Sequence, residues 1–195
     1  MKWLNSQCMD DAYPLPRIDD LLIKQGKNSC FSVMDLKDAF HQVPLHPDSR
    51  PCTGTDTPIG IQQWNVVPMG WENGVAYCQR NLEVGLAPVS DIASGYIDDI
   101  LVGTPLQEKD AVKEMLLQHD KDLRRTLDGL KAADFVASSP KCTFFIKEVE
   151  FCGHCLKEEV TKPLPGRLLS LEKWELPRTI TALHSFLGFC NYYAS

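Results

Sequence analysis

The sequence predicts an α+β fold, in which short apolar strands alternate with amphipathic helices. Residues 29–34 and 94–104 are short, β-prone and mostly apolar, which is typical of buried strands. Residues 107–131 carry apolar side chains at intervals of three and four, which predicts a long helix with one buried face. Turn residues separate these segments at short intervals, so helices and strands are expected to pack into one core.

Size and composition are those of a soluble globular protein. A chain of 195 residues with 44% hydrophobic residues can bury about 70% of its unfolded surface. No apolar run approaches the ~20 residues of a membrane helix, and residues 1–5 begin no signal peptide, so we expect an intracellular protein with no membrane partner. The eight cysteines are scattered, which favours free thiols in a reducing compartment over disulfides.

The charge balance counts against one class of function. The formal net charge is −6, whereas dedicated nucleic-acid binders are basic because Lys and Arg make most phosphate contacts. Any basic surface for nucleic acid is therefore expected to be weak or to lie outside this chain.

The first half of the chain is expected to contain an irregular start, two helices and several strands. Residues 1–16 are expected to be irregular, and Pro14 and Pro16 predict an extended segment at 13–16. Ile18, Leu21 and Leu22 predict a helix over 17–26 that ends at Gly26. The elements expected after it are a strand at 29–34, a turn with a helical piece at 35–42, a strand at 43–45, a turn at 46–48, two strands within 51–68, and a helix at 73–86 capped by Asn73.

The second half is expected to open with a hairpin at 94–104 whose turn carries two acids. His119 lies on the apolar stripe of the following helix, and we interpret it as a packed or hydrogen-bonded core residue rather than a ligand. That stripe consists of Val112, Leu116, His119, Leu123, Leu127 and Leu130. Short strands are expected at 142–146, 149–152 and 154–156, a modest boundary at 157–165, and helices at 166–174 and 179–193.

Three carboxylates stand where apolar strands end. Asp35 follows the strand at 29–34, and Asp98 and Asp99 lie between two apolar runs. An uncompensated buried carboxylate costs several kcal/mol, which favours neutralisation by a metal ion; an ordinary turn is the alternative for an Asp pair. If the strands are neighbours, Asp35 and Asp98 lie side by side, and such oxygen ligands suit Mg²⁺. Two ions about 3.5–4 Å apart serve nucleotidyl transfer or hydrolysis.

Five stretches resemble the reverse transcriptase domain of LTR retrotransposons of the gypsy type and of retroviruses, and they follow one another along the chain in the order that the family has. The box Tyr96-Ile97-Asp98-Asp99 is similar to the family's second catalytic motif, and residues 31–42 to its first. Residues 13–22 resemble the passage from fingers to palm, residues 139–154 the approach to the primer grip, and residues 183–193 the start of the thumb.

The resemblance implies a polymerase palm, an antiparallel sheet with helices on one face and a ferredoxin-like or RRM-like core. It implies a remnant of the fingers and their connection to the palm at 1–23, a palm with finger strands at 24–157, and the start of a thumb or connection at 158–195. By the same resemblance, Asp35, Asp98 and Asp99 are catalytic and hold two Mg²⁺ or Mn²⁺ ions.

Further residue roles follow from the resemblance alone. Phe40 would lie under the incoming sugar and exclude a 2′-hydroxyl, and the backbone amides of Asp38 and Ala39 would meet the triphosphate. Met69 and Gly70 belong to the nucleotide pocket, and Cys152 and Gly153 to the primer grip, where Gly permits close approach of two backbones. Plain core packing is the alternative for Phe40.

The implied function is RNA-directed DNA synthesis on an RNA or DNA template-primer with dNTPs, within a larger polyprotein. The locations compatible with it are the cytoplasm, the nucleus and a virus-like particle. The alternative is a catalytically inactive retroelement fragment kept as a binding or structural module. A nuclease or cyclase is disfavoured because Phe40 and the thumb-like segment would then have no role.

Some residues depart from the family's pattern. Val75 replaces an expected Pro, and Met69 replaces a commoner Phe or Gln. The Lys and Arg that in the family lie upstream and clamp the triphosphate are absent. We therefore expect this chain to bind metal but to extend a primer poorly. The stretch Cys152-Gly153-His154-Cys155 has no second Cys pair at finger spacing, so free cysteines are preferred over zinc there.

Overall fold

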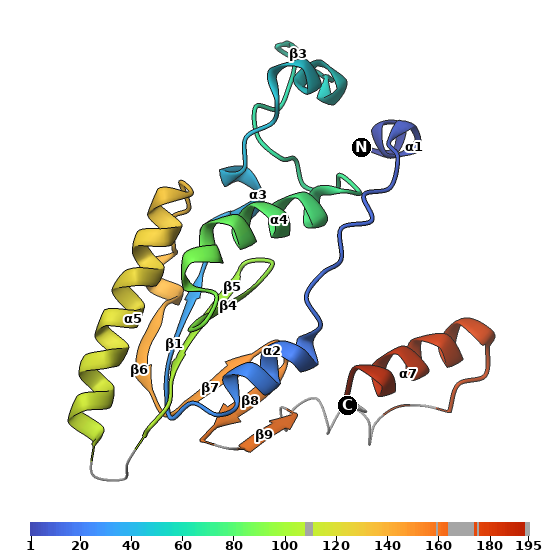
Figure 1. Ribbon diagram of the computed structural model, residues 1–195. Coiled ribbons are helices and arrows are strands. Elements are labelled where there is room, and N and C mark those ends of the chain that lie inside the picture. Colours follow the sequence, from blue (N-terminus) through green and yellow to red (C-terminus); the bar gives the residue numbers. More distant parts are fainter. Residues whose placement is uncertain (108–110, 159, 164–173, 175, 194–195) are drawn as a thin grey trace.

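The computed structural model describes residues 1–107, 111–158, 160–163, 174 and 176–193 (Figure 1). At its centre lies a four-stranded antiparallel sheet with the strand order β4-β5-β1-β6. The strands are β1 (Cys30–Asp35), β4 (Ala93–Tyr96), β5 (Asp99–Thr104) and β6 (Thr143–Ile146). With α4 (Gly74–Leu86) after β1 and α5 (Val112–Ala132) after β5, the chain order is βαββαβ, which is the ferredoxin-like arrangement that was predicted.

The remaining elements extend this core at both ends. The β2–β3 hairpin and α1 lie at one end of the molecule, and α7 lies near the other, beside the small sheet β7-β8-β9 (Figure 1). Their bounds are α1 (Lys2–Gln7), α2 (Ile18–Gln25), α3 (Ala39–Gln42), η1 (Pro47–Thr53), β2 (Thr55–Thr57), β3 (Gly60–Gln62), η2 (Ala87–Val89), η3 (Ser139–Lys141), β7 (Glu148–Phe151), β8 (His154–Lys157), β9 (Val160–Pro163) and α7 (Ile180–Tyr193).

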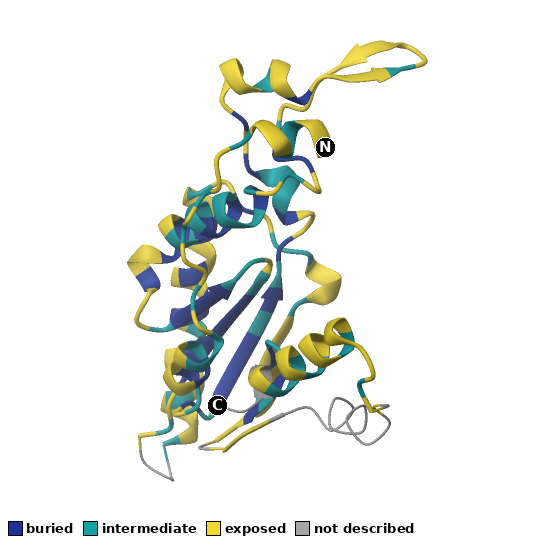
Figure 2. Cartoon of the chain, turned by 90° about the vertical axis from the view of Figure 1, so that its right-hand side faces the viewer, coloured by how far each residue is buried: buried dark blue, intermediate teal, exposed yellow. Residues whose placement is uncertain are grey.

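Both faces of the central sheet are covered, which explains why its strands read as almost continuous apolar runs. On one face Met34, Ile100 and Val102 pack against the apolar sides of α4 and α5. On the other, Phe31 and Leu101 pack against Leu22 of α2 and against Val149, Phe151 and Leu156 of the small sheet. The middle strands are accordingly buried along their length (Figure 2). The predicted α+β palm is confirmed, with a second sheet and α2 opposite its two long helices.

Two predictions for secondary structure were wrong, and a third was incomplete. No strand forms at 43–45, where the chain pairs with 65–67 only through an isolated bridge between Pro44 and Val66, closed by Leu45 N to Asn65 O at 2.9 Å and Val67 N to Val43 O at 3.0 Å. The predicted turn at 46–48 forms, with Ser49 N donating to His46 O at 2.9 Å, and it continues into η1. The N-terminal stretch is not wholly irregular, since α1 forms and Asn5 ties it to Gly70 O at 3.0 Å and to Glu72 N at 3.2 Å.

Other segments differ in their limits. Asn73 precedes α4 but makes no cap bond, because its side chain instead accepts from Asp11 N and donates to Met9 O. The strand β9 was not predicted. Helix α5 starts at Val112 rather than 107, and its buried face is turned from the predicted stripe, leaving Val112, Leu116 and Leu127 exposed. Of the predicted helix at 166–174, residues 166–173 lie outside the described residues.

His119 is the centre of a buried hydrogen-bond chain, as predicted for a core histidine. Its Nε2 lies 2.7 Å from Ser32 Oγ, and its Nδ1 lies 2.9 Å from Thr104 Oγ1. Thr104 must donate its proton to Asp122 Oδ2 at 3.0 Å, so it accepts from Nδ1–H. Ser32 then donates to the bare Nε2 and accepts from Phe145 N. The chain of bonds therefore fixes one neutral tautomer of His119.

This arrangement predicts a loss of stability in mild acid. Burial lowers the pKa of His119 from its ordinary value of about 6.5, against the opposing effect of Asp122 and Asp120. Because the unfolded chain takes up the proton first, the free energy of unfolding should fall as the pH drops below about 6.5 and through the folded pKa. Urea midpoints at pH 7.5 and 5.5 measure this, and His119→Gln should lessen the difference. If the midpoint difference between the two pH values were the same in the wild type and in His119→Gln, the loss of stability in acid would belong to other groups.

Helices α4 and α5 cross closely at two glycines. A Cβ atom on Gly129 would lie 2.8 Å from the carbonyl oxygen of Gly85, which is backbone and cannot rotate away. Gly129→Ala is therefore expected to destabilise the fold by about 2 kcal/mol, the usual cost of overpacking a tight contact. Gly188→Ala in α7, where nothing lies within 4 Å of the added Cβ, is the control and should cause no loss in chemical denaturation. Equal stability of the two variants would contradict the close crossing.

Candidate active site

The three carboxylates predicted to act together lie at one end of the central sheet. The β1–β5 ladder places Asp35 directly opposite Asp99, and the Leu36 N–H group donates to Asp98 O at 2.8 Å. Asp98 lies in the two-residue turn between β4 and β5. The residue opposite Asp35 is thus the second acid of the pair, whereas the sequence led us to expect the first, because strand register cannot be counted from a turn of unknown length.

Mutual repulsion of these acids is evident at Asp99. Its pKa is raised by partial burial, and further by the charges of Asp98 and Asp35, while Lys141 acts in the opposite direction. A carboxylate with a raised pKa beside two others is a group that a cation would stabilise.

Lys141 supplies such a cation and was missed in the sequence. Its Nζ lies 2.9 and 3.1 Å from the two carboxylate oxygens of Asp35. The Asp35 hydrogen bond, and then the charges of Asp35, Asp98 and Asp38, raise the pKa of Lys141. Lys141 and Asp35 are 106 residues apart, so no local pattern could have paired them. The ammonium group shows that this end of the sheet accepts positive charge.

The acids form an open site rather than a closed metal cage. Among the residues described, no three acidic, thiol or imidazole groups are placed to hold a metal ion by themselves. Asp35 has a side chain that is 18% exposed, and Asp98 is exposed. Oxygen ligands in an incomplete shell suit Mg²⁺ or Mn²⁺, which take further ligands from water and phosphate. The residues present therefore fit a divalent ion that a phosphorylated substrate helps to bind.

The residues expected to bind nucleotide follow β1 directly. Asp38 is exposed and has a φ of 49°, which turns the chain sharply into α3, where Ala39 is buried. Phe40 is partly buried, and a Cβ on Gly74 would lie 3.6 Å from its ring. Small Gly74 thus makes room for the ring at the start of α4.

Met69 and Gly70 lie just before that helix. Met69 is 62% exposed and Gly70 has a φ of 83°, a conformation that favours glycine. Both residues are open to solvent, and their contact with a nucleotide stays a prediction.

The tip of the β7–β8 hairpin lies against the acidic turn. Cys152 and Gly153 form it with φ angles of 47° and 76°. Burial, and then the charge of Asp99, raise the pKa of Cys152 to about 12, so the thiol is neutral. His154 Nδ1 contacts Cys152 O at 3.0 Å, and Cys155 donates to Glu148 at 3.0 Å, so these side chains are engaged in contacts other than with a metal.

A pocket of about 600 Å³ joins these parts. It is lined by both hairpin tips, through Asp98, Asp99, Cys152 and Gly153, and by Ser185, Gly188 and Phe189 of α7. The structure therefore brings Asp98 and Asp99, two of the three predicted acids, to one hollow with the expected primer grip and the expected start of the thumb.

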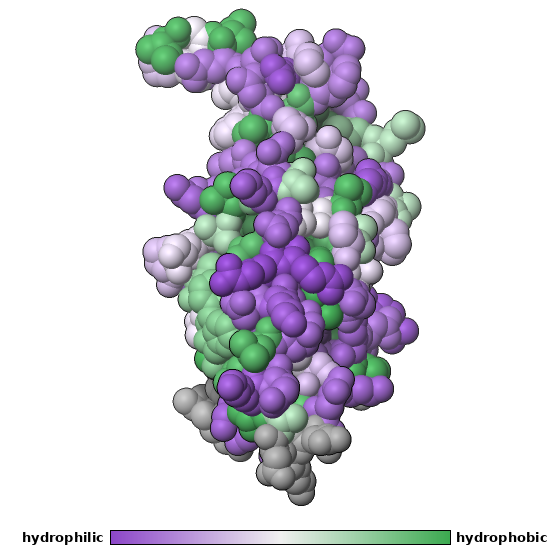
Figure 3. Space-filling view, turned by 60° about the vertical axis from the view of Figure 1, so that its left-hand side comes forward, coloured by the Kyte–Doolittle hydropathy of each residue, from purple (hydrophilic) through white to green (hydrophobic). Residues whose placement is uncertain are grey.

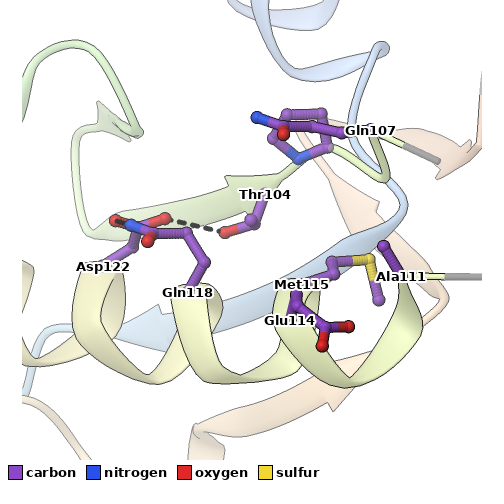
Figure 4. Close-up of a pocket in the computed structure, with 8 residues that line it drawn as sticks. Thr104, Gln107, Ala111, Glu114, Met115, Gln118 and Asp122 are labelled. Atoms are coloured by element: carbon purple, nitrogen blue, oxygen red, sulfur yellow. Dashed lines mark hydrogen bonds between the residues drawn. The ribbon is translucent and has the colours of Figure 1, made fainter.

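Other hollows lie apart from the acids. One of about 230 Å³ lies between the end of β5 and the first turns of α5 (Figure 4). Its polar walls include Asp122 and Thr104, which are hydrogen-bonded to each other and belong to the His119 chain of bonds. The surface on the α5 side is mostly hydrophilic, with an apolar group at the tip of the β2–β3 hairpin, where Ile59 and Ile61 are exposed (Figure 3). None of these features carries the chemistry of the acidic end.

Comparison with known proteins identifies the family. The profile of the family described as "Reverse transcriptase (RNA-dependent DNA polymerase)" matches residues 1–156. The chain belongs to this family. As a reverse transcriptase domain it is 28% identical over 191 residues to the Pol polyprotein of transposon 297 of Drosophila melanogaster, covering 97% of this chain and 17% of that protein. It is 32% identical over 198 residues to the enzymatic polyprotein of Cestrum yellow leaf curling virus, covering 99% and 29%.

Solved structures support the fold of the reverse transcriptase domain. A foamy viral protease-reverse transcriptase in complex with double-stranded DNA superposes with a TM-score of 0.81 at 23% identity, covering 98% of this chain and 32% of that chain. A foamy viral protease-reverse transcriptase in complex with an RNA/DNA hybrid gives a TM-score of 0.73 at 20% identity, covering 98% of this chain and 25% of that chain. The chain thus spans less than a third of each of these four proteins. Among its described residues, no helix is long and apolar enough to cross a membrane.

Proposed function

We propose that this chain is the polymerase core of a retroelement reverse transcriptase and transfers deoxynucleotides to a primer 3′-hydroxyl on an RNA or DNA template. The observation that carries the proposal is the meeting of Asp35, Asp98 and Asp99 at one sheet end beside the Cys152–Gly153 turn. Family membership supports the reaction class, and reverse transcriptases generally depend on divalent metal.

In the reaction, the primer 3′-oxygen attacks the α-phosphorus of the dNTP, the bond to the bridging oxygen breaks, and pyrophosphate leaves. Asp35, Asp98 and Asp99 would hold two Mg²⁺ or Mn²⁺ ions, which when bound supply charge stabilisation for the attacking and leaving oxygens. The turn at Asp38 and Ala39 would present amides to the triphosphate, and the Phe40 ring would pack under the sugar. The Cys152–Gly153 turn would support the primer end.

Lys141 has a role in this scheme before substrate binds. Its ammonium group balances Asp35 and faces Asp98 and Asp38, which keeps the acids from repelling one another in the metal-free chain. Loading a divalent ion onto Asp35 then requires that Lys141 give up this contact.

The domain division is proposed on the same grounds. Residues 1–23 are the remnant of the fingers and their connection, 24–157 the palm with its finger strands, and 158–195 the start of the thumb. Membership in a larger polyprotein, as in the Drosophila and plant-virus relatives, fits the share of their length that the chain covers.

A catalytically inactive retroelement fragment, retained as a binding or structural module or as a relic, is the second candidate. The net charge of −6 favours it, because a polymerase needs basic surface to bind its template. Single-nucleotide extension of a DNA primer on an RNA template distinguishes the two. We expect slow addition, with Mn²⁺ or Mg²⁺, of only that dNTP which pairs with the template base. Absence of any addition at saturating primer-template would favour the binding module.

A further inference from the structure

The side chain of Gln79 connects helix α4 to the turn that carries Asp98. It is completely buried, and its Oε1 accepts from the N–H group of Ile97 at 2.8 Å. Its Nε2 donates to Gly95 O at 3.2 Å and to Glu83 Oε1 at 2.9 Å. The amide nitrogen thus donates two hydrogen bonds and the amide oxygen accepts one. These three bonds fix the orientation of the amide.

The turn needs such support. Ile97 has a φ of 59°, a left-handed conformation that is unfavourable for a β-branched residue. The β4–β5 ladder ends with the pair Tyr96 and Asp99, so it does not hold Ile97 or Asp98. A strained residue persists only where its surroundings hold it, and such residues cluster at functional sites.

Glu83 extends the chain of bonds to the N-terminal segment. Its second oxygen, Oε2, accepts a short hydrogen bond from the hydroxyl of Tyr13, and this bond is the main reason that the pKa of Tyr13 is raised. Arg80 lies over the Tyr13 ring at 4.6 Å and donates to both carboxylate oxygens of Asp11 at 2.7 and 2.8 Å. The segment before α2 is thus attached to the helix that holds the turn.

We propose that Gln79 is a positioning residue that holds the Ile97–Asp98 turn in the shape in which Asp98 O accepts from the Leu36 N–H group next to Asp35, and that the bonds Tyr13–Glu83–Gln79–Ile97 couple the N-terminal segment to this turn. The proposal rests on the proposed function in one respect, the role of Asp98 as a metal ligand. The bonding chain itself is independent of that role.

The test uses two variants and one matched control in the full chain. Gln79→Met keeps the volume and removes all three bonds, whereas Tyr13→Phe removes only the hydroxyl at the far end. Tyr77→Phe on the same helix is the control, since in the part of the chain that the structure describes its hydroxyl donates to Pro44 O at 3.4 Å and takes no part in the bonds around Gln79. The readouts are amide hydrogen exchange at Ile97 by NMR, and Mn²⁺ binding by electron paramagnetic resonance.

We expect exchange at Ile97 to rise about tenfold in Gln79→Met, to rise less in Tyr13→Phe, and to stay unchanged in Tyr77→Phe, with weaker Mn²⁺ binding in the first two. Unchanged exchange in Tyr13→Phe and in Gln79→Met would overturn the proposal, and Tyr13→Phe alone decides if Gln79→Met fails to fold. If exchange at Ile97 were faster in both variants but the wild type bound no Mn²⁺, the positioning role of Gln79 would stand and the proposed metal site would be rejected.

Discussion

Primer extension is expected to fall about 10³-fold when Asp98 is replaced by Asn, the rate equivalent of several kcal/mol of lost charge stabilisation in the transition state. The substitution keeps the size of the side chain and removes its charge at an exposed position of the turn. Folding should therefore be unaffected. Single-turnover extension by one nucleotide in Mn²⁺ is the measurement, because it detects slow addition.

The control is Asp128→Asn, which removes one negative charge from the exposed side of α5. It should leave the rate within a few-fold of wild type. If Asp98→Asn and Asp128→Asn extended the primer equally, Asp98 would have no part in the reaction.

The second large effect is expected for Phe40→Val, on the choice between dNTP and rNTP. The Phe40 ring lies at the start of α3 against Gly74. Shortening the side chain would open space for a 2′-hydroxyl, so the preference for dNTP over rNTP should fall by about 10–100-fold, the range that small steric differences in a pocket produce. The measurement is the ratio of kcat/KM for the two nucleotides with the same template base.

Phe144→Val removes the same atoms from an exposed position on β6 and serves as the control. It should leave the ratio unchanged. A ratio that stays the same in Phe40→Val would place that ring in the core alone, which was the alternative for this residue.

The central strands and the acids at their ends could be predicted because their signals are local. Burial on both faces makes β1 and β5 continuous apolar runs, and charge at the ends of such runs is conspicuous. The role of His119 followed equally from its place on an apolar stripe. These features depend on residues that are close together in the chain, so they can be recognised in the sequence alone.

Features that depend on distant contacts could not be predicted. Lys141 reaches Asp35 across 106 residues, and Gln79 reaches Ile97 from another element. Asn73 has the composition of a helix cap, yet it binds the N-terminal segment instead. The buried face of α5 contains Asp122 and Thr126 because their partners are also buried, a pairing that helical periodicity does not reveal.

The central claim is that Asp35, Asp98 and Asp99 form a divalent-metal site, and Mn²⁺ titration followed by electron paramagnetic resonance tests it most directly. The wild type and Asp128→Asn are predicted to bind Mn²⁺ with equal affinity, more tightly when dNTP and primer-template are present. Asp35→Asn and Asp98→Asn are predicted to lose this binding while remaining folded. Identical Mn²⁺ binding by all four proteins would contradict the assignment of the site.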